Sequence, residues 1–292
     1  MPTTDAHLFV IFGATGDLTR RKLVPALFRV MTANGVAHSL TLLGVGRTEL
    51  DDVGFRTMVR EALGSFLEDR SELAAWCDEN VFYQASPQDA PLFDVRKRIE
   101  EIEADRRLPG NRVLYLALPP GPLPSTITAL GEAGLATSPG WTRLVIEKPF
   151  GKDLESARLL NGLVHSHFAE SQVYRIDHYL GKETVQNLLA FRFANLLFES
   201  SWNRDGVESV EITVAETLGL EGRAGYYDEA GVIRDILQSH LTQLLTLVAM
   251  DAPRDFDADS IRDEKVRLLK AIGRIGEKAV VLGQYAAGAI PG

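Results

Sequence analysis

The chain has 292 residues, of which 45% are hydrophobic and 24% are charged, a balance typical of globular proteins with room for about two domains. A formal net charge of -9 disfavours nucleic acid and anionic membrane surfaces as partners. The single cysteine, Cys77, excludes an intrachain disulfide and a cysteine-built metal site. No apolar run reaches the ~18 residues of a membrane span and residues 1–7 do not resemble a signal peptide, so we expect a cytoplasmic protein.

Short apolar runs alternate with segments of helical composition through the first half of the chain. The runs are Leu8 to Phe12, Leu40 to Val45, Val113 to Leu118 and Leu144 to Ile146. Runs of this length are typical of buried parallel strands. Strands that alternate with helices predict an α/β fold with a doubly wound, Rossmann-type parallel sheet, whose ligands bind at the carboxyl ends of the strands. We place this nucleotide-binding domain at residues 1–150.

A glycine turn follows the first of these runs directly. The turn consists of Gly13, Ala14, Thr15, Gly16, Asp17 and Leu18. After it, Leu23, Leu27 and Met31 recur on one face of a predicted helix. A strand, a tight turn and a helix aim backbone N–H groups at a pyrophosphate, and the helix dipole adds to the attraction. The Gly-x-x-Gly spacing alone also fits an ordinary tight turn, but its place between a first strand and a first helix favours a dinucleotide site.

Arg47 bears on which dinucleotide this site takes. Folds that use NAD place an acid near the end of the second strand, where it binds the ribose 2′-hydroxyl, whereas an arginine there accommodates the 2′-phosphate of NADP. Arg47 stands at that place and predicts NADP. Glu49, two residues further on, leaves NAD open, and an exposed loop arginine is the remaining interpretation.

A nine-residue stretch from Arg175 to Glu183 concentrates chemistry in the second half of the chain, which we treat as a substrate and catalytic domain at residues 151–292. Lys182 opens a predicted helix that runs to Phe193. An ammonium group beside a helix N-terminus favours a phosphate. His178 and Tyr179 add potential donors to such a site. An ordinary surface loop before a helix start is the alternative.

The rest of this domain predicts an α+β arrangement with a largely antiparallel sheet. Alternating apolar and polar residues predict one-sided strands at 207–217, with Glu216 near the end, and at 277–285. A helix is predicted from Gly231 to Met250, and His240 lies within its apolar stripe. A histidine in that position is either a core residue or a buried neutral imidazole that acts as a base near its ordinary pKa of ~6.5.

Five segments taken together resemble glucose-6-phosphate dehydrogenase, in order and separation along nearly the whole chain. They are Gly13-Ala14-Thr15-Gly16-Asp17-Leu18, Glu147-Lys148-Pro149-Phe150-Gly151, Arg175-Ile176-Asp177-His178-Tyr179-Leu180-Gly181-Lys182-Glu183, Glu221-Gly222-Arg223-Ala224-Gly225-Tyr226-Tyr227-Asp228 and Asp235-Ile236-Leu237-Gln238-Ser239-His240. The resemblance implies oxidation of glucose 6-phosphate at C1 to 6-phosphogluconolactone, the first step of the oxidative pentose phosphate pathway, with hydride transfer to NADP⁺.

The resemblance also implies a role for each site residue. His240 is the implied general base for the anomeric hydroxyl, and Asp177 the carboxylate that orients it. The implied substrate residues are Lys148, His178, Tyr179, Lys182, Glu216 and Asp235. The implied cofactor residues are the glycine turn, Arg47, and Arg21 or Lys22, with Lys148 between sugar and nicotinamide and held by a cis bond to Pro149. No metal is implied, because the cofactor takes the hydride.

Three departures from the resemblance affect these expectations. Relatives are expected to continue for about another domain and to form homo-oligomers, so we expect the second domain to be truncated here. Residues 82–86 lack an expected glycine–acid pair, and Ser239 replaces the more usual asparagine. Two alternatives stay open: a catalytically inactive NADP-binding fragment or paralogue that acts as a binding module, and an oxidoreductase of unphosphorylated sugars.

Overall fold

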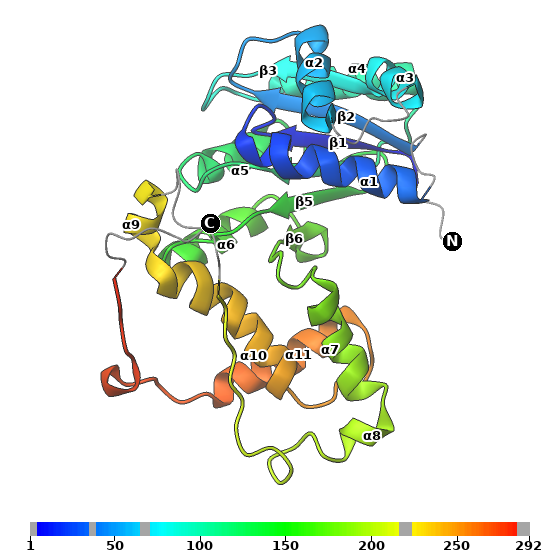
Figure 1. Cartoon of the computed structure of the whole chain (residues 1–292). Coiled ribbons are helices and arrows are strands. Elements are labelled where there is room, and N and C mark those ends of the chain that lie inside the picture. Colours follow the sequence, from blue (N-terminus) through cyan, green and yellow to red (C-terminus); the bar gives the residue numbers. More distant parts are fainter. Residues whose placement is uncertain (1–4, 35–38, 65–70, 216–223, 285–292) are drawn as a thin grey trace. The chain divides into compact units, whose positions relative to one another are not determined.

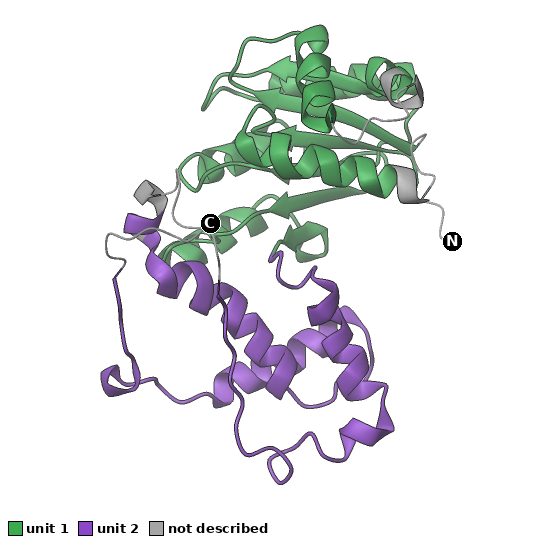
Figure 2. Ribbon diagram, in the orientation of Figure 1, with its two compact units in different colours: residues 1–176 green, residues 177–292 purple. Residues whose placement is uncertain are grey.

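The computed structural model describes residues 5–34, 39–64, 71–215 and 224–284 (Figure 1). The chain divides into two compact units, residues 1–176 and 177–292 (Figure 2). Among the described residues, no helix has the length and apolar character that a membrane crossing requires.

A six-stranded parallel sheet organises the first unit, with strand order β3-β2-β1-β4-β5-β6. Its strands are β1 (His7–Phe12), β2 (Leu40–Gly46), β3 (Val81–Ala85), β4 (Arg112–Leu116), β5 (Thr142–Ile146) and β6 (Val173–Arg175). This order reverses direction at β1, which is the switch point where α/β proteins of this kind bind dinucleotides. Phe12, the last residue of β1, pairs with Val45 and with Leu116, so the carboxyl ends of the three central strands are level. The prediction of a Rossmann-type parallel sheet is confirmed.

Helices cover both faces of the sheet because alternate strand residues point to opposite sides. The helical elements are η1 (Thr19–Leu23), α1 (Val24–Asn34), α2 (Asp52–Leu63), α3 (Ser71–Asn80), α4 (Phe93–Arg106), α5 (Leu123–Glu132), α6 (Leu154–His165) and the short η4 (Glu170–Gln172). Val10 of β1 packs with residues of α4, α5 and α6, whereas its neighbour Ile11 packs with residues of α1, α2 and α3. Helix α6 and strand β6 follow residue 150 and belong to the first unit, while the domain boundary at residue 150 stays a prediction.

Helices make up the regular structure described in the second unit. They are α7 (Glu183–Phe193), α8 (Leu196–Glu199), α9 (Ala224–Val232), the π-helical η6 (Ile233–Leu241), α10 (Thr242–Ala249), α11 (Ala258–Ala271) and the 3-10 turn η7 (Glu277–Ala279). The predicted helix from Gly231 to Met250 is confirmed in η6 and α10. Gly231 has a non-helical φ of 67°. It therefore separates η6 and α10 from the main part of α9.

The predicted antiparallel strands are wrong for the described residues. Residues 207–215 are irregular, residues 277–279 form η7, and residues 280–284 pair with no strand. Alternation describes only how side chains partition between two faces, whereas a strand also needs a neighbouring backbone to complete its hydrogen bonds. Val210 and Val281 are 50% and 96% exposed, whereas Val207, Ile212 and Val214 are half-buried.

Cys77 gives a direct test of the packing of α3 against the sheet. The thiol lies in the apolar cluster with Phe55 and Tyr83, and burial raises its pKa to about 11, an effect that nearby Arg60 partly opposes. Because only the thiolate reacts with iodoacetamide, we expect the native protein to be alkylated at pH 8 about 100-fold more slowly than the urea-unfolded chain. Mass spectrometry of timed samples measures this ratio. Equal rates in the two states would contradict the packing of α3.

Candidate active site

The glycine turn after β1 is held by short backbone hydrogen bonds. The N–H groups of Gly13 and Ala14 donate to Val45 O at 2.9 and 3.0 Å, and Gly16 N–H donates to Gly13 O at 3.0 Å. Gly13 has φ of 85°, and a Cβ there would lie 2.4 Å from Ala117 O. Only glycine fits this position, because an L side chain would meet both backbone strain and a backbone atom. Glycine at position 13 therefore lets the turn pack closely against the segment that follows β4.

A cavity of about 560 Å³ lies at the carboxyl ends of β1, β2, β3 and β4, where the fold predicts a dinucleotide. Among its lining residues are Gly13, Thr15, Gly16, Arg47 and Gln88. The Arg47 guanidinium donates from Nη1 to Gln88 Oε1 at 3.0 Å. The cavity wall therefore carries a cation at the end of β2, as the sequence predicted.

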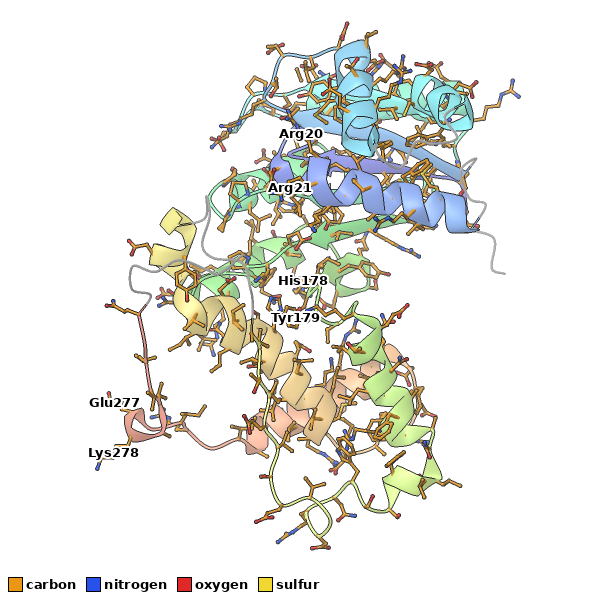
Figure 3. The ribbon with its side chains drawn as sticks, in the orientation of Figure 1. Arg20, Arg21, His178, Tyr179, Glu277 and Lys278 are labelled. Atoms are coloured by element: carbon orange, nitrogen blue, oxygen red, sulfur yellow. The ribbon has the colours of Figure 1, made fainter. Side chains whose placement is uncertain are left out.

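The other members of the predicted cofactor set lie outside this wall. Ala14 is fully buried, and Asp17 and Leu18 are exposed. Arg21 lies 3.5 Å from Asp17 in an exposed ion pair (Figure 3 labels Arg21 and its neighbour Arg20). Sequence reasoning missed Gln88 and the other residues that follow β3. The sequence contains no motif there, and only the general rule that ligands bind at the carboxyl ends of parallel strands could have indicated them.

The Glu147-Lys148-Pro149 segment ends β5, and its Lys148–Pro149 bond is cis, as the resemblance implied. Tyr115 donates its hydroxyl proton to Glu147 Oε1 at 2.5 Å. Burial raises the pKa of Tyr115, and the hydrogen bond to Glu147 raises it further, so the phenol stays protonated and keeps donating. This bond fixes the residue next to Lys148 at the end of the sheet.

In the second unit, Asp177 and His240 meet although 63 residues separate them. His240 Nδ1 and Asp177 Oδ1 are 2.6 Å apart, and the histidine side chain is only 1% exposed. Asp177 Oδ1 also accepts the Tyr179 N–H at 2.9 Å, which fixes the carboxylate relative to its own loop. The predicted pairing is therefore present, while the catalytic role of the pair stays a prediction.

Three further predicted residues surround this pair. The Tyr179 ring stacks on His240 with centroids 4.1 Å apart and planes at 14°, and the His178 ring meets His240 edge-on at 4.6 Å. Lys182 Nζ lies 3.6 Å from the Tyr179 ring centroid. Lys182 is the N-cap residue of α7, so its backbone stands at the positive end of that helix. Figure 3 labels His178 and Tyr179 in the loop that leads into α7.

Asp235 and His240 are both buried on η6. In a π-helix each N–H bonds five residues back, so residues at i and i+5 lie on the same side. The π-helical geometry therefore brings Asp235 and His240 to one face, which an α-helix does not do. Glu216, the remaining predicted substrate residue, lies outside the described residues, as do residues 221–223 of the resemblance.

Lys265 on α11 is a neighbour of the pair that sequence reasoning missed. Its ammonium donates to Gln243 Oε1 at 3.0 Å. Burial lowers the pKa of Lys265, while the negative charge of Asp177 raises it. The sequence of α11 is that of an ordinary charged helix. Nothing in its pattern distinguishes Lys265 from the exposed charged residues of the same helix.

Two side chains, one on α7 and one in the turn after α8, donate hydrogen bonds to the end of α10. The buried Arg192 donates to Leu247 O at 2.7 Å and to Met250 O at 2.9 Å. Trp202 Nε1 donates to Val248 O at 2.8 Å. The last carbonyls of a helix have no intrahelical donors, so these contacts satisfy them and hold α7 and the turn after α8 against the end of α10.

Replacing Arg192 with methionine is expected to loosen the end of α10. Hydrogen bonds from charged donors contribute about 1.5–3 kcal/mol, so we expect backbone amides of α10 to exchange about 10–100-fold faster. Hydrogen exchange followed by mass spectrometry measures this. Arg192→Lys keeps the charge and one donor and is the control, with a smaller expected change. Unchanged exchange in the methionine variant would contradict the role of Arg192.

Comparison with known proteins gives consistent matches along the chain. Residues 10–187 match the family model "Glucose-6-phosphate dehydrogenase, NAD binding domain", and residues 189–292 match "Glucose-6-phosphate dehydrogenase, C-terminal domain". Proteins named glucose-6-phosphate 1-dehydrogenase from Aggregatibacter actinomycetemcomitans and Dickeya dadantii are 43% and 44% identical over 97% and 99% of this chain, and 59% of each relative is covered. A third relative, from Arabidopsis thaliana, is 42% identical over 98% of this chain and 57% of its own length, and its name adds "cytoplasmic".

Solved structures agree with these matches. One described as glucose-6-phosphate dehydrogenase in complex with its substrate glucose-6-phosphate superposes with a TM-score of 0.89 at 38% identity, over 98% of this chain and 60% of that chain. Another, from Mycobacterium avium, has a TM-score of 0.83 at 34% identity, over 97% of this chain and 60% of that chain. The chain thus spans about three fifths of the length of the relatives it matches.

Proposed function

The chain belongs to the glucose-6-phosphate dehydrogenase family, and from that premise we propose that it oxidises glucose 6-phosphate at C1 to 6-phospho-D-glucono-1,5-lactone with NADP⁺ as the hydride acceptor. The observation that carries the proposal is the 2.6 Å contact between Asp177 and His240. A solved relative described as a complex with glucose-6-phosphate supports the choice of sugar. The relative named as cytoplasmic supports the same compartment for this chain.

His240 acts as the base that takes the proton of the anomeric hydroxyl. Asp177 is an acceptor when ionised, so His240 Nδ1 carries the hydrogen of the shared bond and Nε2 is the basic nitrogen. Proton uptake converts the ring to an imidazolium, which the Asp177 carboxylate stabilises. The stacked Tyr179 ring favours the same charge through its π face. NADP⁺, when bound, accepts the hydride that leaves C1.

The 6-phosphate is assigned to His178, Tyr179 and Lys182. The supporting observations are Lys182 as the N-cap residue of α7 and the exposed His178 ring beside the buried pair. A phosphate there meets both a cation and the positive end of a helix dipole. Asp235 is assigned to a sugar hydroxyl, since it lies one π-helical turn before His240. Lys148 is assigned to the boundary between sugar and nicotinamide, and Glu216 to a further hydroxyl.

Turnover tests this assignment directly. The purified chain is mixed with glucose 6-phosphate and NADP⁺, and the absorbance of the reduced cofactor is followed. We expect turnover with glucose 6-phosphate and not with glucose. If neither NADP⁺ nor NAD⁺ supports turnover, the catalytic proposal fails for this chain. Calorimetry then separates the alternatives: binding of NADP⁺ without binding of glucose 6-phosphate identifies a nucleotide-binding module.

Arg47 is assigned to the 2′-phosphate of NADP⁺. Its guanidinium lies in the wall of the cavity at the end of β2, and Thr15 and Thr48 hydroxyl oxygens lie 3.1 Å apart beside it. An arginine–phosphate contact contributes about 1.5–3 kcal/mol, so Arg47→Ala is expected to weaken NADP⁺ binding about 10–100-fold and to leave NAD⁺ binding nearly unchanged. Calorimetry with both nucleotides measures this. Arg254→Ala, at an exposed arginine of the second unit, is the control. Equal losses for the two nucleotides would contradict the assignment.

A further inference from the structure

Asp177, His178 and His240 form a cluster of metal-binding donors. Each offers one ligand atom, and these three atoms lie within 4.8 Å of one another. We propose that these side chains form an inhibitory site for a zinc-type divalent cation. The binding half of this proposal is independent of the catalytic assignment, whereas the inhibitory half rests on it.

The spacing of the three donors is close to that of a zinc site. Zinc binds imidazole nitrogen and carboxylate oxygen at about 2.0–2.2 Å in tetrahedral geometry, which puts neighbouring ligand atoms about 3.3–3.6 Å apart. The Asp177–His240 contact of 2.6 Å has to open, and the widest separation in the cluster, at most 4.8 Å, has to close. Both changes are small for side chains. His178 is exposed and adjoins Asp177 on one loop, so it can rotate toward the fixed, buried His240.

The donor set and the surrounding charge favour zinc over magnesium or calcium. Two imidazoles and one carboxylate suit borderline cations, whereas magnesium and calcium prefer sets of oxygen ligands. Lys182 lies over the Tyr179 ring, which itself stacks on His240, and the Lys265 ammonium feels the charge of Asp177. These two ammonium groups oppose a cation that is held by charge alone. Zinc also forms direct bonds to the imidazole nitrogens, so it tolerates the two ammonium groups better than magnesium or calcium does.

Zinc at this site has a chemical consequence for the Asp177–His240 pair. A carboxylate oxygen and an imidazole nitrogen that both bind the metal no longer share a hydrogen bond with each other. Three protein ligands leave the fourth zinc position open to water, as in other three-ligand sites. The metal therefore takes the place of the proton that the pair holds, and His240 loses its function as a base.

Calorimetry tests the binding half. Zinc chloride is titrated into the 292-residue chain, and we expect one saturable site that is at least about 10-fold weaker in His178→Ala. His165→Ala is the matched control, because His165 Nε2 also lies 2.8 Å from a carboxylate, that of Glu170, and both side chains are exposed. The control is expected to bind zinc like the parent chain, and magnesium is expected to give no saturable heat. Equal zinc affinity in His178→Ala, or loss in His165→Ala, overturns the proposal.

Cobalt provides a second, spectroscopic measurement. Co²⁺ takes the same ligands as zinc and gives strong visible absorption in a four-coordinate site. We expect this absorption in the parent chain and in His165→Ala, and its loss in Asp177→Asn and His178→Ala. The thermal melting curve of each variant checks that it is folded, and a ligand variant that melts like the parent chain yet keeps the absorption overturns the proposal.

Turnover tests the inhibitory half. Zinc is expected to stop reduction of NADP⁺ by glucose 6-phosphate, and EDTA to restore it. Activity that EDTA restores, together with weaker inhibition of His178→Ala than of the parent chain, supports the site. Equal inhibition of the parent chain and His178→Ala overturns the inhibitory half of the proposal. If the chain shows no turnover, the catalytic assignment fails, and calorimetry and cobalt absorption still decide whether the metal site exists.

Discussion

Replacing His240 with asparagine is expected to lower kcat for glucose 6-phosphate about 10³–10⁴-fold. The asparagine side-chain amide can still donate a hydrogen bond to Asp177 from nearly the position of His240 Nδ1. The packing against Tyr179 is partly kept, but the asparagine amide does not take a proton at neutral pH. Substrate binding is expected to change little, because His178 and Lys182 are assigned to the phosphate. Steady-state kinetics and calorimetry with glucose 6-phosphate measure both quantities.

His165→Asn is the matched control for this substitution. His165 also contacts a carboxylate, that of Glu170, but on the surface of the first unit. Its replacement is expected to leave kcat unchanged. The outcome that would contradict the assignment of His240 is a lower melting temperature with kcat retained. That result would mean that His240 is only a buried packing residue of η6.

Sequence reasoning succeeded where local pattern and global fold agree. The β1 run, the glycine turn and the helix after it have the lengths and order of one βαβ unit, and the register of β1 with β2 and β4 follows. The pairing of Asp177 with His240 joins residues 63 positions apart, and it came from the resemblance rather than from any local pattern. The cis bond before Pro149 has the same origin.

The features that were missed depend on partners that no local pattern contains. The alternation at residues 207–215 is real, but no neighbouring strand lies beside it among the described residues, so its backbone forms no ladder. The sequence of η6 has the apolar spacing expected of an α-helix, and nothing in that spacing predicts the π-helical hydrogen-bond pattern. Lys265 and Arg192 look like ordinary helix charges in the sequence. Their burial follows from the packing of α7 and α11 against α10.

Glu103→Leu is expected to destabilise the first unit by about 3–5 kcal/mol. Glu103 on α4 accepts two hydrogen bonds of 2.7 Å from Arg112, the first residue of β4, and the two side chains are 10% and 5% exposed. Removing the carboxylate leaves the guanidinium buried with only a long contact to Thr137 O at 3.4 Å. The cost is large because the charge keeps its desolvation penalty and loses its counter-charge. Urea unfolding of the parent chain and the variant measures the difference.

The double variant Glu103→Leu/Arg112→Met separates the cost of an unpaired charge from the net contribution of the pair. Apolar replacements of both partners of a buried ion pair are often neutral or stabilising, so the double variant is expected to be within about 1 kcal/mol of the parent chain or above it. A double variant as unstable as Glu103→Leu would show that the pair itself holds α4 on the sheet. β4 leads directly to Ala117, whose carbonyl closes the space beside Gly13. Binding of NADP⁺ to the double variant therefore reports whether the carboxyl end of β4 keeps its position when the charges at its other end are gone.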